Sequence, residues 1–263
     1  MKLFQWIKGS GKSKLPYLAA NLQGVGSRNR QEDSFAFANV FDAEQIEKKG
    51  LLFVVADGMG GMRDGKIASD TAVYSIKNDF EKMDRSADLG EQLVQSTFRA
   101  SSFVEERLDG YGGSTLIAGI LYEKKLYYAS VGDSFLYLMR DNQLIRINSS
   151  HNLENQMYLE NIMDGGFDPD SADDSEAAAL TQFLGMVGMS EVDSFVTPFQ
   201  MQDRDIILAC SDGVAGVITE PLILECLRND EPQQMCMALE KEILNQRRGN
   251  QDNYTALIIQ CTF

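Results

Sequence analysis

Hydrophobic residues recur along this chain in short runs rich in β-branched and aromatic side chains, separated by turn-forming residues. Such runs predict β-strands near 17–25, 34–40, 51–56, 114–121, 126–131, 134–139, 143–147, 206–210 and 254–261. The segment Leu126–Ile147 has the pattern of a meander, with Gly132-Asp133 and Asp141-Asn142 as its turns. We therefore expect neighbouring strands in this segment to pair antiparallel.

A helical periodicity marks two long amphipathic segments, near 65–84 and 88–108, and two further helices near 219–228 and 232–246. The two long helices should turn a set of large side chains inward: Ile67, Ala72, Ile76, Phe80 and Met83 from the first, and Leu89, Leu93, Phe98, Phe103 and Leu108 from the second. The helices come in pairs between groups of strands and do not alternate strictly with them. The pattern therefore predicts an α+β fold in which helices cover antiparallel sheets.

The composition is that of a globular domain, because 44% of the 263 residues are hydrophobic and can supply a sizeable core. We expect a single domain over residues 15–263, preceded by a basic tail over residues 1–14. The tail carries four lysines around Phe4, Trp6 and Ile7, so it could rest on an anionic membrane or a partner, or simply fray in solvent. No apolar run is long enough for a signal peptide or a membrane span.

The net charge limits the classes of binding partner, and the cysteine content indicates the redox state of the compartment. A formal net charge of −15 argues against binding to nucleic acid or anionic lipid by general attraction. The four cysteines form no CxxC pair and lie in or beside apolar segments. We expect free buried thiols, which suit a reducing, cytoplasmic compartment.

Several familiar chemistries find no support in the residues. None of the four cysteines is followed six residues later by the arginine that a cysteine-based phosphatase needs. The segment 9–13 resembles the tail of a phosphate-binding P-loop, but the required first glycine is Trp6 and no strand precedes it. Asp168-Pro-Asp170 resembles the start of an EF-hand loop, but the fifth and twelfth positions are Ala172 and Ala179. A solvated acidic loop is the simpler interpretation.

What remains is a set of acidic residues placed at the ends of predicted strands. Asp57-Gly58 and Asp212-Gly213 each end an apolar run, and Asp133 follows another. Glu32-Asp33 and Asp252 each stand just before a strand. A single Asp-Gly pair is usually only a turn. If the sheets bring these positions together, however, their charges would repel one another unless divalent cations neutralised them, and an all-oxygen ligand set suits Mg²⁺ or Mn²⁺ better than zinc.

Six short motifs stand in a fixed order along the chain: Arg28-Asn-Arg-Gln-Glu-Asp33-Ser, Val54-Val-Ala-Asp-Gly-Met-Gly-Gly61, Gly113-Ser-Thr115, Val131-Gly-Asp-Ser134, Ser211-Asp-Gly213 and Asp252-Asn-Tyr-Thr255. In this order and spacing they resemble the motifs of the protein phosphatase 2C family, the metal-dependent serine/threonine phosphatases. The resemblance spans about residues 20–262. The form Asp-Gly-Met-Gly-Gly is similar to the bacterial branch of that family.

The resemblance implies a fold of two packed antiparallel sheets flanked by helical layers, with two metal ions in a cleft at one end of the sandwich. Carried over by motif, Asp57 should bridge the two metals, and the Gly58 carbonyl should bind one of them. Asp212 and Asp252 should complete one of the two sites.

The resemblance assigns further roles around this pair of sites. Glu32 and Asp33 should support the other metal, directly or through water. Asp133 matches an aspartate associated with a third, weaker metal. Arg28 matches the arginine that grips the phosphate, since a guanidinium can bind two phosphate oxygens at once. Arg30 is its neighbour and the less favoured candidate.

The sequence also departs from the family pattern. Met59 stands where eukaryotic relatives often carry a histidine, Met62 where many bacterial members carry one, and Phe135 replaces an arginine. None of these changes removes a proposed metal ligand. We interpret His151, the single histidine, as structural or near the base of a flap. The flap should span roughly residues 152–184, and its acidic stretch either influences substrate choice or is only a solvated loop.

The function that the resemblance implies is hydrolysis of phosphoserine and phosphothreonine in proteins, by a water activated between two Mn²⁺ or Mg²⁺ ions. Expected partners are phosphorylated proteins and a cognate serine/threonine kinase. Two alternatives stay open at this stage. One is a catalytically silent module that keeps the fold and binds phosphoproteins, and the other is a metal-dependent phosphatase for small metabolites.

Overall fold

The computed structural model describes residues 15–59, 64–163, 178–246 and 249–263. Its strands are β1 (Tyr17–Gly24), β2 (Ser34–Ala38), β3 (Leu51–Ala56), β4 (Leu116–Tyr122), β5 (Lys125–Val131), β6 (Phe135–Arg140), β7 (Gln143–Arg146), β8 (Asp193–Ser194), β9 (Phe199–Gln200), β10 (Ile206–Cys210) and β11 (Tyr254–Cys261). Its helices are α1 (Ala43–Lys49), α2 (Gly65–Phe80), α3 (Leu89–Leu108), α4 (Leu153–Met163), α6 (Asp212–Ala215), α7 (Glu220–Leu227) and α8 (Pro232–Asn245). The predicted basic tail over 1–14 lies outside the described residues.

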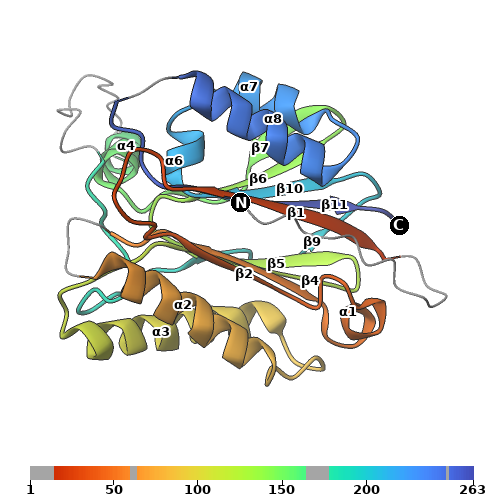
Figure 1. The fold of residues 1–263 in the computed structure, drawn as a ribbon. Helices are drawn as coiled ribbons and strands as arrows, with labels where there is room; N and C mark the ends of the chain where they lie inside the picture. The colour runs from red at the N-terminus through yellow and green to blue at the C-terminus, as the bar shows by residue number, and fades with distance from the viewer. Residues whose placement is uncertain (1–14, 60–63, 164–177, 247–248) are drawn as a thin grey trace.

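These elements form two antiparallel sheets that pack face to face, with helices on each outer face (Figure 1). One sheet has the order β1-β11-β10-β6-β7, and the other has the order β2-β3-β4-β5-β8, with β9 also paired to β5. Helices α2 and α3 cover the second sheet, and α7 and α8 cover the first (Figure 1). The predicted α+β class and the sandwich implied by the family resemblance are both confirmed.

The central strand β3 shows why the fold forms, because all six of its side chains are buried. Successive side chains of a strand point to opposite faces. Leu51, Phe53 and Val55 therefore enter the core between the two sheets, while Leu52 and the alternate residues after it pack under α2 and α3. A strand that is buried on both faces reads as a continuous apolar run, and for this reason its bounds could be predicted from the sequence.

The predicted meander is wrong at its first turn. Strands β5 and β6 do not pair, because β5 belongs to one sheet and β6 to the other. The chain crosses between the sheets at Gly132, which has φ of +95° and lies against Thr115. The second turn is confirmed: Arg140 pairs with Gln143, and Asp141-Asn142 between them has positive φ at both residues, as a type I′ hairpin requires.

The helical prediction is confirmed in position, but parts of the predicted inward faces are wrong. Ile67 of α2 is 38% exposed and Phe103 of α3 is 51% exposed. Small residues such as Ala68 and Ala100 face the sheet instead, together with Val104. No helix within the described parts of the chain is long and apolar enough to span a bilayer.

Candidate metal centre

Both sheets bring strand ends to the same end of the sandwich, beside α4 and α6 (Figure 1). Strand β3 pairs antiparallel with β2, so that Ala56 at the end of β3 lies opposite Ser34 at the start of β2. In the other sheet, Cys210 at the end of β10 lies opposite Ala256 near the start of β11. Residues that follow β3 and β10 are therefore gathered with residues that precede β2 and β11.

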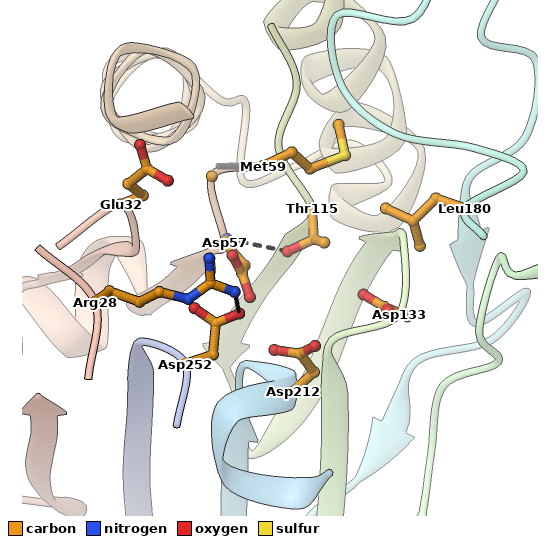
Figure 2. Close-up of a pocket in the computed structure, with 10 residues that line it drawn as sticks. Arg28, Glu32, Asp57, Met59, Thr115, Asp133, Leu180, Asp212 and Asp252 are labelled. Atoms are coloured by element: carbon orange, nitrogen blue, oxygen red, sulfur yellow. Dashed lines mark hydrogen bonds and ion pairs between the residues drawn. The ribbon is translucent and has the colours of Figure 1, made fainter. Parts of the chain in front are cut away.

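A cleft with a volume of about 170 Å³ opens at this edge. Its walls are Arg28, Glu32, Asp57, Gly58, Met59, Thr115, Asp133, Leu180, Asp212 and Asp252. Figure 2 shows the carboxyl groups of Asp57, Asp133, Asp212 and Asp252 turned toward the same space, while Glu32 stands apart beside a helix. Of the predicted site residues, only Asp33 is not part of the wall.

The backbone of Asp57 is fixed by the start of β4. The Asp57 N–H donates to Thr115 Oγ1 at 3.0 Å, and the Asp57 carbonyl accepts from Thr115 N–H and Ser114 Oγ. The next residue, Gly58, lies so close to Gly65 that an added Cβ would be 2.2 Å from the Gly65 carbonyl oxygen. Glycine is therefore required after Asp57 for the chain to turn sharply at the cleft.

Asp212 is placed by a tight contact between β10 and the loop that leads into β11. It is the first residue of α6. Ser211 Oγ accepts from Thr255 N–H, and Ser211 N–H donates to the Thr255 carbonyl, both at 3.0 Å. A Cβ at Gly213 would lie 1.8 Å from the Asn253 carbonyl oxygen, so only glycine permits this approach.

Asp33 lies directly behind the cleft, with no exposed surface. Ser211 Oγ and Thr255 Oγ1 donate to its Oδ2 at 2.9 and 2.7 Å. Its other oxygen, Oδ1, is buried and has no hydrogen-bond partner among the described residues. Burial raises the pKa of Asp33 to about 6, although the two hydroxyl donors lower it in part. Asp33 thus has one carboxyl oxygen that accepts no hydrogen bond from a donor group in the described parts of the chain, and its carboxyl group interacts with that of Asp57.

Three carboxyl groups in the wall of the cleft also have raised pKa values, because the folded protein disfavours their charged forms. Burial raises the pKa of Asp57 well above its usual value, and the charges of Asp33, Asp212 and Asp133 add to that effect. Burial raises the pKa of Asp133 to about 6, with a further contribution from the charge of Asp212. Burial also raises the pKa of Asp212, and Asp252 adds to it. Cations bound among these carboxyl groups would stabilise their charged forms and so lower their pKa values again.

The donor set fits divalent cations, although the side chains are not yet arranged around one. As they are placed, no three acidic, histidine or cysteine side chains in the described residues stand in a group that could hold a metal ion. Asp252 accepts a hydrogen bond from Arg28, and Asp33 accepts from the hydroxyls of Ser211 and Thr255. These contacts explain in part why the carboxylates do not converge on one point. The Asp33 oxygen that accepts no hydrogen bond from the described residues and the raised pKa values of three wall carboxyls still identify a cluster whose negative charge Arg28 neutralises only in part. All-oxygen donors suit Mg²⁺ or Mn²⁺.

Arg28 stands at the rim of the cleft. Its Nη2 donates to Asp252 Oδ2 at 2.6 Å (Figure 2), and both side chains are about half exposed. The predicted phosphate-binding arginine and one predicted metal ligand are therefore direct neighbours. An exposed pair of this kind contributes little to stability, so its geometry matters for the site more than for the fold.

His151 lies outside the wall of the cleft and is buried. Its Nδ1 accepts from the Gly132 N–H, and the backbone N–H of His151 donates to the Gly132 carbonyl. Burial lowers the pKa of His151, which keeps the ring neutral and able to accept. This agrees with its interpretation as a structural residue that holds the turn before Asp133.

Met59, Thr115 and Leu180 line the cleft but were not predicted as members of the site. Met59 was noted only as a departure from the family pattern. Thr115 lies within a motif that the sequence analysis quoted, so its hydroxyl could have been noticed there. Leu180 belongs to the expected flap over 152–184, and nothing in the sequence marks it. It is placed by a bridge to Asn152 at the start of α4. Residues 164–177 of that flap, and Met62, lie outside the described residues.

Comparison with known proteins identifies the arrangement. The family model described as Protein phosphatase 2C matches residues 22–158, which is just over half of the chain. This chain belongs to the protein phosphatase 2C family. The match includes the segments that carry Arg28, Glu32, Asp57 and Asp133.

Relatives in the family extend over nearly the whole chain. The serine/threonine phosphatase stp of Listeria innocua is 28% identical over 244 residues, covering 89% of this chain and 91% of its own. A catalytic domain of the phosphatase PstP, solved with two manganese ions, has a TM-score of 0.74 at 24% identity and covers 94% of this chain and 99% of its own. PppA of Pseudomonas aeruginosa has a TM-score of 0.71 at 25% identity, covering 93% and 97%.

Proposed function

We propose that this protein phosphatase 2C member hydrolyses phosphoserine and phosphothreonine in proteins, with two divalent cations held by the carboxylate cluster. The observation that carries the proposal is the convergence of strand-end carboxylates in one cleft beside the Arg28 guanidinium, in a chain of this family. When bound, the two cations supply a water of lowered pKa and neutralise charge on the phosphoryl oxygens.

The carboxylates of the cluster can be divided between the two proposed cations. Asp57 is central, because its carboxyl group is affected by the charges of Asp33, Asp212 and Asp133. We propose that Asp57 would serve both cations and the Gly58 carbonyl one of them, and that Asp212 with Asp252 would complete one of the two sites. Glu32 and Asp33 would support the other cation from the β2 side.

A third, weaker cation would lie at Asp133, which forms the opposite wall of the cleft (Figure 2). Its carboxyl group responds to the charge of Asp212. Both Mn²⁺ and Mg²⁺ fit oxygen donors of this kind.

Arg28 would orient the substrate. One of its terminal nitrogens is paired with Asp252, and the guanidinium has further N–H groups that can bind two oxygens of a phosphoryl group. Because the same arginine touches a cation ligand, the phosphoryl group would be held directly beside the cations. This is the positioning that a hydrolytic attack on phosphorus requires.

Side-chain nucleophiles are not needed in this scheme. Among the described residues, the wall of the cleft contains no histidine or cysteine. All four cysteines are free and buried, and burial raises the pKa of Cys236 to about 12 and of Cys226 to about 11. Free thiols of this kind also support our proposal that the protein works in the reducing cytoplasm, on phosphoproteins and opposite a serine/threonine kinase.

The substrate class is tested by comparing phosphate release from a phosphothreonine peptide and from glycerol phosphate, each with Mn²⁺ and with Mg²⁺. We expect faster release from the peptide, and loss of both activities in Asp212→Asn. Faster release from glycerol phosphate would favour a metabolite phosphatase. Tight peptide binding without release by the folded protein would favour the silent binding module.

A further inference from the structure

Asn253 is a buried amide at the point where two loops of the cleft meet. One loop, residues 25–33, joins β1 to β2, and the other leads into β11. The Asn253 side chain is 4% exposed. Its Nδ2 donates to the carbonyls of Val25 and Arg30, both at 2.9 Å, and its Oδ1 accepts from the Glu32 N–H at 2.7 Å.

These three hydrogen bonds enclose the segment that carries Arg28. Val25 lies before Arg28 in the chain, and Arg30 and Glu32 lie after it. A single side chain therefore fixes the backbone on both sides of the arginine and also the backbone of Glu32, a proposed metal support. Only a carboxamide can do this, because two donors and one acceptor must act from one planar group.

Further contacts hold the same two loops together but leave Arg28 itself adjustable. Ser27 N–H and Oγ both donate to the Gln251 carbonyl, at 2.8 and 2.9 Å. The side chain of Arg28 pairs with Asp252 and is 55% exposed. Because more than half of the side chain is exposed, the position of the guanidinium depends on its pair with Asp252 and on the backbone that Asn253 holds.

We infer that Asn253 is a positioning residue, which sets the Arg28 guanidinium and the Glu32 backbone relative to Asp252. The inference rests on the proposed function, because Arg28 is taken to bind the phosphoryl group of the substrate. Asn253→Ala removes all three hydrogen bonds. Asn253→Asp keeps the acceptor for Glu32 N–H but loses both donors, and it turns a carboxylate toward two carbonyl oxygens.

We expect the Asn253 variants to bind substrate more weakly, because Arg28 is no longer held in position. We expect Asn253→Ala to raise KM for a phosphothreonine peptide by about tenfold, with a smaller change in kcat. Asn253→Asp should show the same direction, and it serves as the test if the alanine variant does not fold. In a double-mutant cycle, Asn253→Ala should add less than about twofold to the KM of Arg28→Ala, because residues that act through one another are not additive.

A second readout does not depend on activity. Hydrogen exchange of the backbone amides over 25–33, Glu32 above all, should be faster in Asn253→Ala by about tenfold or more, since the Glu32 N–H loses its acceptor. Asn39→Ala is the matched control. Asn39 Nδ2 also donates to a loop carbonyl, that of Gly50, at 2.9 Å, but it follows β2 at the opposite end of the sandwich. That variant should leave KM and the exchange over 25–33 unchanged.

The outcomes separate the inference from the function on which it rests. If the wild-type protein releases no phosphate with any cation, the proposed function is overturned. The exchange measurement would still test whether Asn253 holds the backbone over 25–33. An active wild-type protein with additive KM effects, or with unchanged exchange over 25–33 in the Asn253 variant, would overturn the positioning role.

Discussion

Asp133→Asn should stabilise the metal-free protein while it removes one carboxylate from the site. Asp133 forms one wall of the cleft, and its pKa rises from 3.8 to about 6 on folding, first because of burial and then because of the charge of Asp212. The folded protein thus holds the Asp133 proton more tightly than the unfolded chain does. Ionisation of Asp133 therefore favours unfolding, and asparagine cannot ionise.

The magnitude follows from the size of the pKa rise. A rise of roughly two units is worth about 3 kcal/mol at a pH well above 6, at 1.36 kcal/mol for each unit. Allowing for relaxation of neighbouring charges, we expect Asp133→Asn to gain about 2–3 kcal/mol of unfolding free energy at pH 8. The gain should shrink steadily as the pH falls below 6, to less than about 1 kcal/mol at pH 4, and vanish below about pH 3, where the carboxyl group is protonated in both states.

The assay is urea unfolding followed by circular dichroism, in the presence of a chelator, at pH 8 and pH 4. Asp141→Asn is the matched control, because Asp141 lies in an exposed hairpin turn with positive φ, which asparagine also tolerates. That control should change stability little. Added Mn²⁺ should narrow the gap between wild type and Asp133→Asn, because cations neutralise the same charges. Equal stabilities at pH 8, or a gain at pH 4 as large as that at pH 8, would show that the raised pKa of Asp133 does not destabilise the folded protein.

Three further predictions concern the residues around the cleft. Arg28→Ala should raise KM for phosphopeptide with a smaller effect on kcat, and Arg28→Lys should recover only part of the loss; an unchanged KM in steady-state assays would place the phosphate contact elsewhere. Thr115→Val should cost about 1–3 kcal/mol in chemical denaturation, because the Asp57 N–H is left without its acceptor, whereas Thr219→Val, at an exposed helix start with no capping bond, should cost little. Gly213→Ala should abolish phosphate release and lower the melting temperature, since its Cβ would lie 1.8 Å from a backbone carbonyl oxygen; a fully active, equally stable variant would show that the contact is not required.

The sequence predicted most of the strands because the central ones are buried on both faces. Strands β3 and β10 follow continuous apolar runs with the bounds that were expected. The same property explains why β5 and β6 were wrongly predicted to pair, since strands that are apolar on both faces can join either sheet. The short helix α1 was missed, although Asp42 caps it by accepting from the N–H groups of Glu44 and Gln45.

The candidate site was predictable where chemistry follows directly from a strand end. Asp57, Asp212 and Asp252 lie beside apolar runs, and antiparallel pairing brings such ends together. Asn253 could not be assigned in the same way, because its role depends on carbonyl groups more than 200 residues earlier in the chain. Leu180 enters the cleft through a contact with Asn152 that no local pattern encodes.

Hydrolysis should depend on cations that the carboxylate cluster holds, and a single comparison decides this. Phosphate release from a phosphothreonine peptide is compared between wild type and Asp57→Asn, with Mn²⁺ and with a chelator, after both proteins are shown to be folded. We expect release only by wild type and only with the metal. Release in the presence of chelator, or full activity of Asp57→Asn, would contradict it.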